Sequence, residues 1–185
     1  MSLRRGFKTE AEYHASEFRR ELKLPPHSPI SPWKLAAHLE IPVHPLSEFQ
    51  CHAKSDIEFL LRQGADAFSA VTLFFGRHHC RRKIIYNDGN AKTRQASDIA
   101  HELSHAVLGH PATKMFEDDP ILDEEAKWMG PCLLIPKAAA LWIVRNNMPI
   151  ATVVVEYGVS PALAQMRIRG SGAQIIASRS QRKSG

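Results

Sequence analysis

The chain has 185 residues, of which 44% are hydrophobic and 23% charged, and its formal net charge is +5. This composition predicts one domain with a substantial core and excludes a disordered chain. No run of about 18 apolar residues marks a membrane span, and the charged N-terminus lacks the apolar segment of a secretory signal. The three cysteines are odd in number and far apart, which argues against a disulfide framework or a cysteine zinc finger. We therefore expect a cytoplasmic protein without a membrane partner.

The excess positive charge lies in two clusters, at residues 77–83 and 167–183. Basic clusters of this kind can bind nucleic acid or an acidic protein. More often they are the solvated tip of a hairpin and a loose tail. Nucleic acid is therefore a partner that the sequence allows without favouring.

The first 50 residues predict two helices and a connector. Apolar side chains recur on one helical face over residues 8–22, and the proline-rich stretch that follows cannot be helical. Ser31 then makes a plausible N-cap for a short helix over residues 32–39, with proline at its first position. Residues 41–46 predict a short extended piece.

The middle of the chain predicts a helix and then a hairpin. Residues 54–63 read as a helix that Ser55 or Asp56 would cap. β-branched and aromatic residues flank a polar centre, which predicts antiparallel strands near 67–75 and 83–87.

The rest of the chain predicts helices. The longest of these covers about 91–108, with Gly109 and Pro111 ending it. Further helices are expected over residues 121–133, 135–146, 150–158 and 160–170. The fold class is therefore α+β, with a small antiparallel hairpin packed against the longest helix and additional helices at both ends.

We divide the chain into four parts on this basis. Residues 1–50 form an N-terminal helical segment of the same unit, and residues 51–147 form the core. Residues 148–178 form a C-terminal helical extension, and residues 179–185 form a disordered basic tail.

The sequence H-E-x-x-H lies within the longest expected helix, at His101, Glu102 and His105. Because residues four apart share a helical face, both imidazoles can reach the same metal ion. Glu102 lies about 100° further round the helix, where it can reach a water bound to that ion. Zinc in catalytic sites takes three protein ligands and a water, so a third ligand is needed.

The third ligand is expected on the following helix. A third histidine six residues after the second is excluded, because Pro111 occupies that position. The apolar face of residues 121–133 is flanked by Asp123 on one side and Glu125 on the other, while Glu124 points away from it. Either Asp123 or Glu125 is therefore a candidate ligand.

The stretches "AHELSHAVLGH" and "DEEAKWMGPCLLIP" together resemble the ImmA/IrrE family of metallopeptidases. The resemblance implies a zincin-like fold in which zinc is bound by His101, His105 and Asp123, with Glu102 as the catalytic base. The chain departs from the family where Asp123 replaces a glutamate and Lys127 replaces an asparagine or aspartate. Three readings stay open: Asp123 binds the metal, Glu125 substitutes for it, or the site is weakened.

The resemblance implies a zinc metallopeptidase that cleaves a specific protein, such as a helix-turn-helix repressor in trans. The alternative is a catalytically weakened pseudo-peptidase that acts as a DNA- or protein-binding regulator. For this alternative, residues 157–170 look like the second half of a helix-turn-helix, with Arg167 and Arg169 exposed. The sequence leaves the group that stabilises the oxyanion unassigned, with four candidates: His78, His79, Tyr86 and His110.

Overall fold

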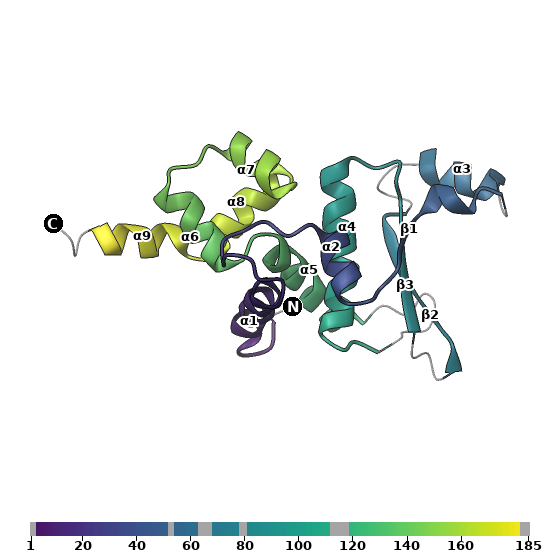
Figure 1. Ribbon diagram of the computed structural model, residues 1–185, viewed down its shortest axis with the longest axis horizontal. Coiled ribbons are helices and arrows are strands. Elements are labelled where there is room, and N and C mark those ends of the chain that lie inside the picture. Colours follow the sequence, from purple (N-terminus) through teal and green to yellow (C-terminus); the bar gives the residue numbers. More distant parts are fainter. Residues whose placement is uncertain (1–2, 52–53, 63–67, 78–80, 112–118, 182–185) are drawn as a thin grey trace.

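The computed structural model describes residues 3–51, 54–62, 68–77, 81–111 and 119–181. Its central element is helix α4 (Lys92–Val107), which carries the H-E-x-x-H sequence. Helix α4 packs against a small sheet, against α2 (Pro32–His38) and against α5 (Pro120–Leu134). In Figure 1, the sheet lies on one side of α4, and α5 lies on the other. The expected α+β fold is confirmed.

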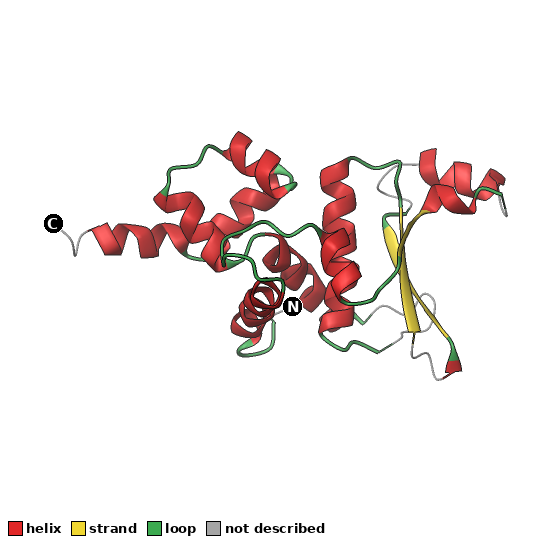
Figure 2. Ribbon diagram, viewed as in Figure 1, coloured by secondary structure: helices red, strands yellow, loops and turns green. Residues whose placement is uncertain are grey.

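The sheet in the described residues has three strands: β1 (Val43–Pro45), β2 (Ala70–Phe75) and β3 (Arg81–Tyr86). The antiparallel hairpin of β2 and β3 confirms the prediction, although residue 67 lies outside the described residues. Strand β1 pairs with β3 in parallel, which the sequence did not predict. The order β1-β3-β2 places β2 at one edge of the sheet, and β2 packs against α4. Figure 2 shows the strands in yellow beside this helix.

Alternation along β3 joins the sheet to two apolar clusters. Ile84 and Tyr86 point to the main core, which they share with residues of α1, α2, α4 and α5. Ile85 points to the opposite face and packs with Leu46 and Ile57. Because both faces are covered, the register of β3 is fixed by burial.

Two short helices cover the second face of the sheet: the 3-10 helix η1 (Leu46–Phe49) and α3 (Lys54–Arg62). Helix α3 begins at Lys54, so the prediction that Ser55 or Asp56 caps it is wrong. Both residues lie inside the first turn, where an acidic side chain is favourable in a helix without being its cap. The start of α2 agrees with the prediction, with Ser31 at the N-cap position and Pro32 first in the helix, and the helix ends one residue before the predicted Leu39.

Buried arginines hold the C-terminal end of α5. Arg19 of α1 (Phe7–Glu21) donates to the carbonyls of Leu133 and Leu134, and Arg167 donates to that of Ile135. These carbonyls would otherwise lack partners at the helix end. Arg167 also pairs with Glu12 of α1 at 2.5 Å. The side chains of Arg19 and Arg167 therefore link α1, α5 and the C-terminal helices.

Four helices follow α5, namely α6 (Lys137–Arg145), α7 (Ile150–Tyr157), α8 (Pro161–Gly170) and α9 (Ala173–Gln181). The first three confirm the prediction, and α9 was not predicted. Residues 179–181 are helical where a disordered tail was expected, and residues 182–185 lie outside the described residues. Within the described chain, no helix has the length and apolar character needed to cross a membrane.

Candidate metal centre

Helix α4 presents His101 and His105 toward α5. Ile99 and Leu103 are fully buried in the main core, so they fix the rotation of the helix about its axis. The two histidines lie one turn apart on the neighbouring face, and their Nε2 atoms are 3.3 Å apart. The sequence prediction that the two imidazoles face a common point is therefore met by the structure.

Helix α5 places Asp123 beside this pair. Asp119 caps the helix by accepting hydrogen bonds from the backbone N–H groups of Ile121 and Leu122, and Pro120 is the first helical residue. Asp123 then lies in the first turn, with Oδ1 3.3 Å from His101 Nε2. Ligand atoms of His101, His105 and Asp123 all lie within 4.8 Å of one another.

These spacings suit a tetrahedral zinc ion. With bonds of about 2.0–2.1 Å at tetrahedral angles, neighbouring ligand atoms are about 3.3–3.4 Å apart. The Nε2–Nε2 distance and the distance from His101 Nε2 to Asp123 Oδ1 are both 3.3 Å. Two imidazoles and one carboxylate are also the ligand types that zinc takes in catalytic sites.

Gly130 allows α5 to approach α4 closely. A Cβ atom at this position would lie 3.2 Å from the backbone of Ala100 and 3.2 Å from His101 N. The two helices therefore touch backbone to backbone directly behind the first histidine. Residues through Leu134 remain helical although Pro131 lies inside α5. This contact sets the distance from α4 at which Asp123 is held.

Lys127 pairs with the second oxygen of Asp123. Its Nζ lies 2.7 Å from Asp123 Oδ2, one helical turn along α5. Asp123 Oδ1 is left facing His101, so the ammonium and the imidazole divide the two oxygens between them. Lys127, which stands where the family pattern has an asparagine or aspartate, thus places a cation on the carboxylate of Asp123.

Glu102 faces the sheet. Thr72 of β2 donates a hydrogen bond of 2.5 Å from Oγ1 to Glu102 Oε2, which orients the carboxylate. Burial raises the pKa of Glu102 above its ordinary value, and the hydrogen bonds from Thr72 oppose this rise. A carboxylate with a raised pKa accepts a proton more readily, which is the property that a general base requires.

The two histidines favour the neutral form. Burial lowers the pKa of His101, and burial together with the neighbouring histidines lowers the pKa of His105 to about 4. Neutral imidazoles have a free lone pair, and a metal ion needs that lone pair for coordination. The protonation state of the site therefore suits metal binding at neutral pH.

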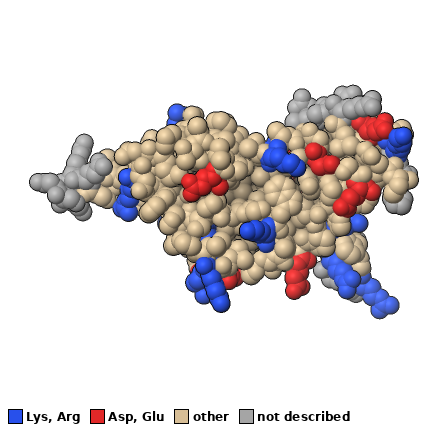
Figure 3. Space-filling view, turned by 45° about the horizontal axis from the view of Figure 1, so that its top comes forward, with Lys and Arg blue, Asp and Glu red and all other residues tan. Residues whose placement is uncertain are grey.

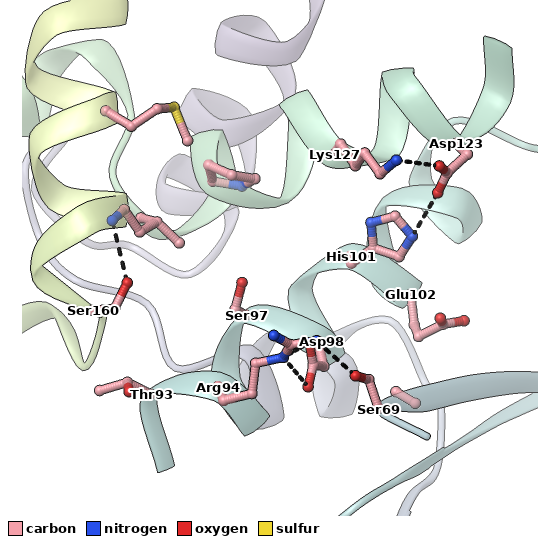
Figure 4. A pocket seen from close by; sticks show the side chains of 14 residues that line it. Ser69, Thr93, Arg94, Ser97, Asp98, His101, Glu102, Asp123, Lys127 and Ser160 are labelled. Atoms are coloured by element: carbon pink, nitrogen blue, oxygen red, sulfur yellow. Dashed lines mark hydrogen bonds and ion pairs between the residues drawn. The ribbon is translucent and has the colours of Figure 1, made fainter. Parts of the chain in front are cut away.

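A cavity of about 690 Å³ opens beside His101 and Asp123. Figure 4 shows His101, Asp123 and Lys127 on one side of it, with Arg94 and Asp98 at the other end. A second cavity of about 250 Å³ lies along β2. Both cavities are lined by Ala70, His101, Glu102 and Asp123, so the site is open from two sides.

Glu125, the other candidate ligand, lies behind the site. It is buried, and its carboxylate contacts His110 at 3.3 Å and Arg4 at 2.6 Å. The structure therefore brings Asp123, and not Glu125, to the two histidines.

Of the two candidate oxyanion groups in the described part of the chain, His110 lines the smaller cavity and Tyr86 lines neither. His110 is buried against His105, and Tyr86 packs against Trp33 with ring centroids 5.9 Å apart. His78 and His79 lie outside the described residues.

Sequence reasoning missed three polar features of the site: Thr72, the cation at Lys127, and the ion pair of Arg94 and Asp98. Asp98 lies four residues before Glu102, so helical spacing alone could have placed it on the same face. Thr72 comes from another element, and only the packing of β2 on α4 brings it to Glu102.

The basic clusters do not form a single binding surface on the described residues. Lys83 and Arg82 lie over the rings of Phe75 and Phe74, so part of their role is to cover apolar groups. On the face in Figure 3, basic and acidic side chains are interspersed over most of the surface. The prediction that Arg167 is exposed is wrong, because it is 1% exposed and binds the end of α5.

The fold and the site together define a class of protein. A helix with H-E-x-x-H, a carboxylate on the next helix and a half-buried glutamate beside the cavity are the arrangement of a metal-dependent hydrolase.

A model of the IrrE N-terminal-like domain (Peptidase_M78) matches residues 64–169, which is more than half of the 185 residues. The chain belongs to this family, as its sequence predicted. The family assigns it a function of the metallopeptidase type. No match was found among curated proteins.

Proposed function

We propose that the chain is a zinc-dependent peptidase in which His101, His105 and Asp123 bind the metal and Glu102 is the catalytic base. The observation that carries this proposal is the clustering of the three ligand atoms. They all lie within 4.8 Å of one another, and His101 Nε2 is 3.3 Å from both His105 Nε2 and Asp123 Oδ1. The half-buried carboxylate of Glu102 adjoins the same cavity.

Bound zinc would polarise the scissile carbonyl and lower the pKa of the attacking water. Glu102 accepts the proton of that water and later passes it to the leaving nitrogen. Thr72 keeps Glu102 Oε2 in place during both transfers through its 2.5 Å hydrogen bond. Lys127 restrains Asp123, whose side chain is shorter than the glutamate of the family pattern.

The edge of β2 is the proposed docking site for the substrate backbone. In the described residues, β2 pairs only with β3, and its other edge borders the cavity that contains Glu102. An extended peptide can add to such an edge as a further strand. This mode of binding brings a peptide bond across the metal site and favours a protein substrate with an exposed, extended segment.

The identity of that substrate remains a prediction from the sequence. Regulatory cleavage of a helix-turn-helix repressor in trans would fit this mode of binding, because an extended segment of such a repressor could add to the edge of β2. Zinc is the metal that best suits a set of two imidazoles and one carboxylate.

The first test is metal content. Zinc per chain is measured by elemental analysis in the wild type, His105→Ala, Asp123→Ala and Glu125→Ala. We expect about one zinc in the wild type and in Glu125→Ala purified with excess zinc, and little in the other two. A wild type that binds no zinc after it is supplied would overturn the proposal.

The second test is proteolysis. The wild type and Glu102→Gln are incubated with a proteome, and new peptide N-termini are labelled and sequenced. We expect termini that appear only with the wild type and disappear when zinc is chelated. Identical sets of termini from the two proteins would contradict a peptidase role.

A further inference from the structure

We infer that His110, Glu125 and Arg4 form a hydrogen-bonded chain that orients the metal-binding imidazole of His105 from its buried side. The inference rests on the proposed role of His105 as a ligand, and it assigns a positioning role to three residues outside the ligand set. They come from the loop after α4, from α5 and from the segment before α1.

The chain starts at the ring of His105. Its Nε2 is the atom that lies 3.3 Å from His101 Nε2 in the ligand set, so its Nδ1 points the other way. There, His105 Nδ1 lies 2.9 Å from His110 Nδ1. The two rings are nearly perpendicular, with an interplanar angle of 71°.

The turn after α4 brings His110 back onto His105. Gly109 has a φ of +66°, a left-handed conformation that favours glycine. The backbone N–H of His110 then bonds to the carbonyl of His105 at 2.9 Å, and that of Gly109 bonds to the carbonyl of Ala106. The turn that ends α4 therefore places the imidazole of His110 against His105, and His110 is only 7% exposed.

Metal binding fixes the direction of the hydrogen bonds. A neutral imidazole that coordinates through Nε2 has its proton on Nδ1, so His105 donates to His110 Nδ1. His110 then has its own proton on Nε2, which lies 3.3 Å from Glu125 Oε2. Each donor in the chain thus faces an acceptor.

Arg4 fixes the far end of the chain. Its Nε donates to Glu125 Oε1 at 2.6 Å, and its Nη1 pairs with Glu10 Oε2 at 2.7 Å. The side chain of Glu125 is 6% exposed, so its charge needs both of its partners. Because both oxygens are engaged, the carboxylate is held for His110 and is not available as a third ligand.

Metal-bound histidines usually donate directly to a carboxylate or carbonyl, which fixes the ring and makes it a stronger ligand. In this chain a second imidazole is inserted, because Glu125 lies on α5 and meets His110 instead of His105. Loss of such a partner typically weakens metal binding about 10–100-fold. We expect an effect of this size for His110.

The test measures zinc affinity of the full chain by competition with a chromophoric chelator. The variants are His110→Ala, His110→Asn, Glu125→Gln and the double variant His110→Ala/Glu125→Gln, with Glu124→Gln as the exposed neighbouring control. The Asn side chain can accept the bond from His105 near the position of His110 Nδ1. Circular dichroism of the metal-free proteins checks that each variant folds.

We expect zinc to bind about 10–100-fold more weakly in His110→Ala and closer to wild type in His110→Asn. The double variant should bind like His110→Ala, because both changes break one chain. Absorption bands of the Co²⁺-loaded protein should shift in His110→Ala and stay unchanged in Glu124→Gln.

A folded His110→Ala that keeps wild-type zinc affinity and an unchanged Co²⁺ spectrum would overturn the inference. Additive losses in the double variant would show two independent structural roles and would overturn it as well. A wild type that binds no zinc at all is a different result, since it overturns the proposed function itself.

Discussion

Asp123 and Glu125 are two residues apart on α5, yet they serve opposite sides of the histidine pair. Asp123 is half-buried, faces His101 and lies at the cavity, with Lys127 on its outer oxygen. Glu125 is buried behind His105, with His110 and Arg4 as its partners. A step of two residues turns a helical side chain by about 200°, so neighbours in sequence reach opposite sides of the site.

The comparison distinguishes an open side from a closed side. On the open side, Glu102 and Asp123 adjoin a cavity of about 690 Å³ that can admit substrate. On the closed side, His110 and Glu125 are both about 6% exposed at the side chain. Changes at Glu102 should therefore alter chemistry, whereas changes at Asp123, at its partner Lys127 and on the closed side should alter metal affinity.

The largest effect is expected for Glu102→Gln, which breaks the open side alone. Hydrolysis should fall about 10²–10⁴-fold, because Gln cannot accept the proton of the attacking water. Zinc content should stay at the wild-type level, since Glu102 is not in the ligand set. Turnover of a cleavable substrate and elemental analysis measure the two quantities, and concurrent loss of zinc would contradict the assignment.

A smaller effect is expected for Lys127→Met, which removes the cation from Asp123 Oδ2. Loss of a residue that bonds to a metal ligand typically weakens metal binding about 10–100-fold. Because Lys127 is exposed to solvent, we expect zinc affinity to fall by the smaller of these factors, about 10-fold. Lys137→Met, at an exposed position on α6, is the matched control. Equal affinities in the two variants would show that Asp123 needs no partner.

Gly130→Ala tests the backbone contact between α4 and α5, which sets the distance of Asp123 and Glu125 from the two histidines. The new Cβ would lie 3.2 Å from the backbone of α4, and we expect the unfolding free energy to fall. An overpacking cost of about 1–3 kcal/mol exceeds the gain of about 1 kcal/mol in helix propensity, which leaves a loss of about 1 kcal/mol.

The control is Gly170→Ala, where the nearest atom to the new Cβ is in Trp128 at 3.6 Å. Urea denaturation should show no loss of stability for this variant. An equal gain in the unfolding free energy of Gly130→Ala and Gly170→Ala would contradict the prediction, because it would mean that α4 and α5 can move apart without a loss of stability.

The smallest effect concerns stability of the metal-free protein as a function of pH. Burial raises the pKa of Glu102 in the folded state above its unfolded value of 4.5. The unfolded state therefore releases this proton first, and stability is lost as pH rises from about 4.5 through the folded pKa.

The glutamine of Glu102→Gln has no titrating carboxyl group. At pH values above the folded pKa of Glu102, the variant should therefore melt at a higher temperature than the wild type. Below pH 4.5 the two proteins should melt at similar temperatures. Thermal melting in the presence of a chelator measures the difference. A variant that is less stable than wild type at neutral pH would contradict the pKa direction.

Local patterns in the sequence predicted most of the elements and part of the site. Helix α4, its two histidines and Glu102 were predicted because helical spacing fixes their relative positions over one turn. Helix α9 was missed, and Ser55 and Asp56 were wrongly expected to cap α3, because helix ends depend on weak local preferences.

Helical spacing alone could not choose between Asp123 and Glu125, since both flank the buried face of α5, and only the family resemblance favoured Asp123. The backbone contact at Gly130 and the partners of Glu125 made that choice in the folded protein.

The sequence by itself determined the α+β class, the family and the pair of facing histidines on α4, because these depend on residue type and on spacing within one element. Only the tertiary structure decided which carboxylate meets the histidines, that Thr72 orients Glu102, and that Arg167 is a structural residue. These features join elements that are far apart in the chain. Their distances are set by packing of one element on another, which no local pattern encodes.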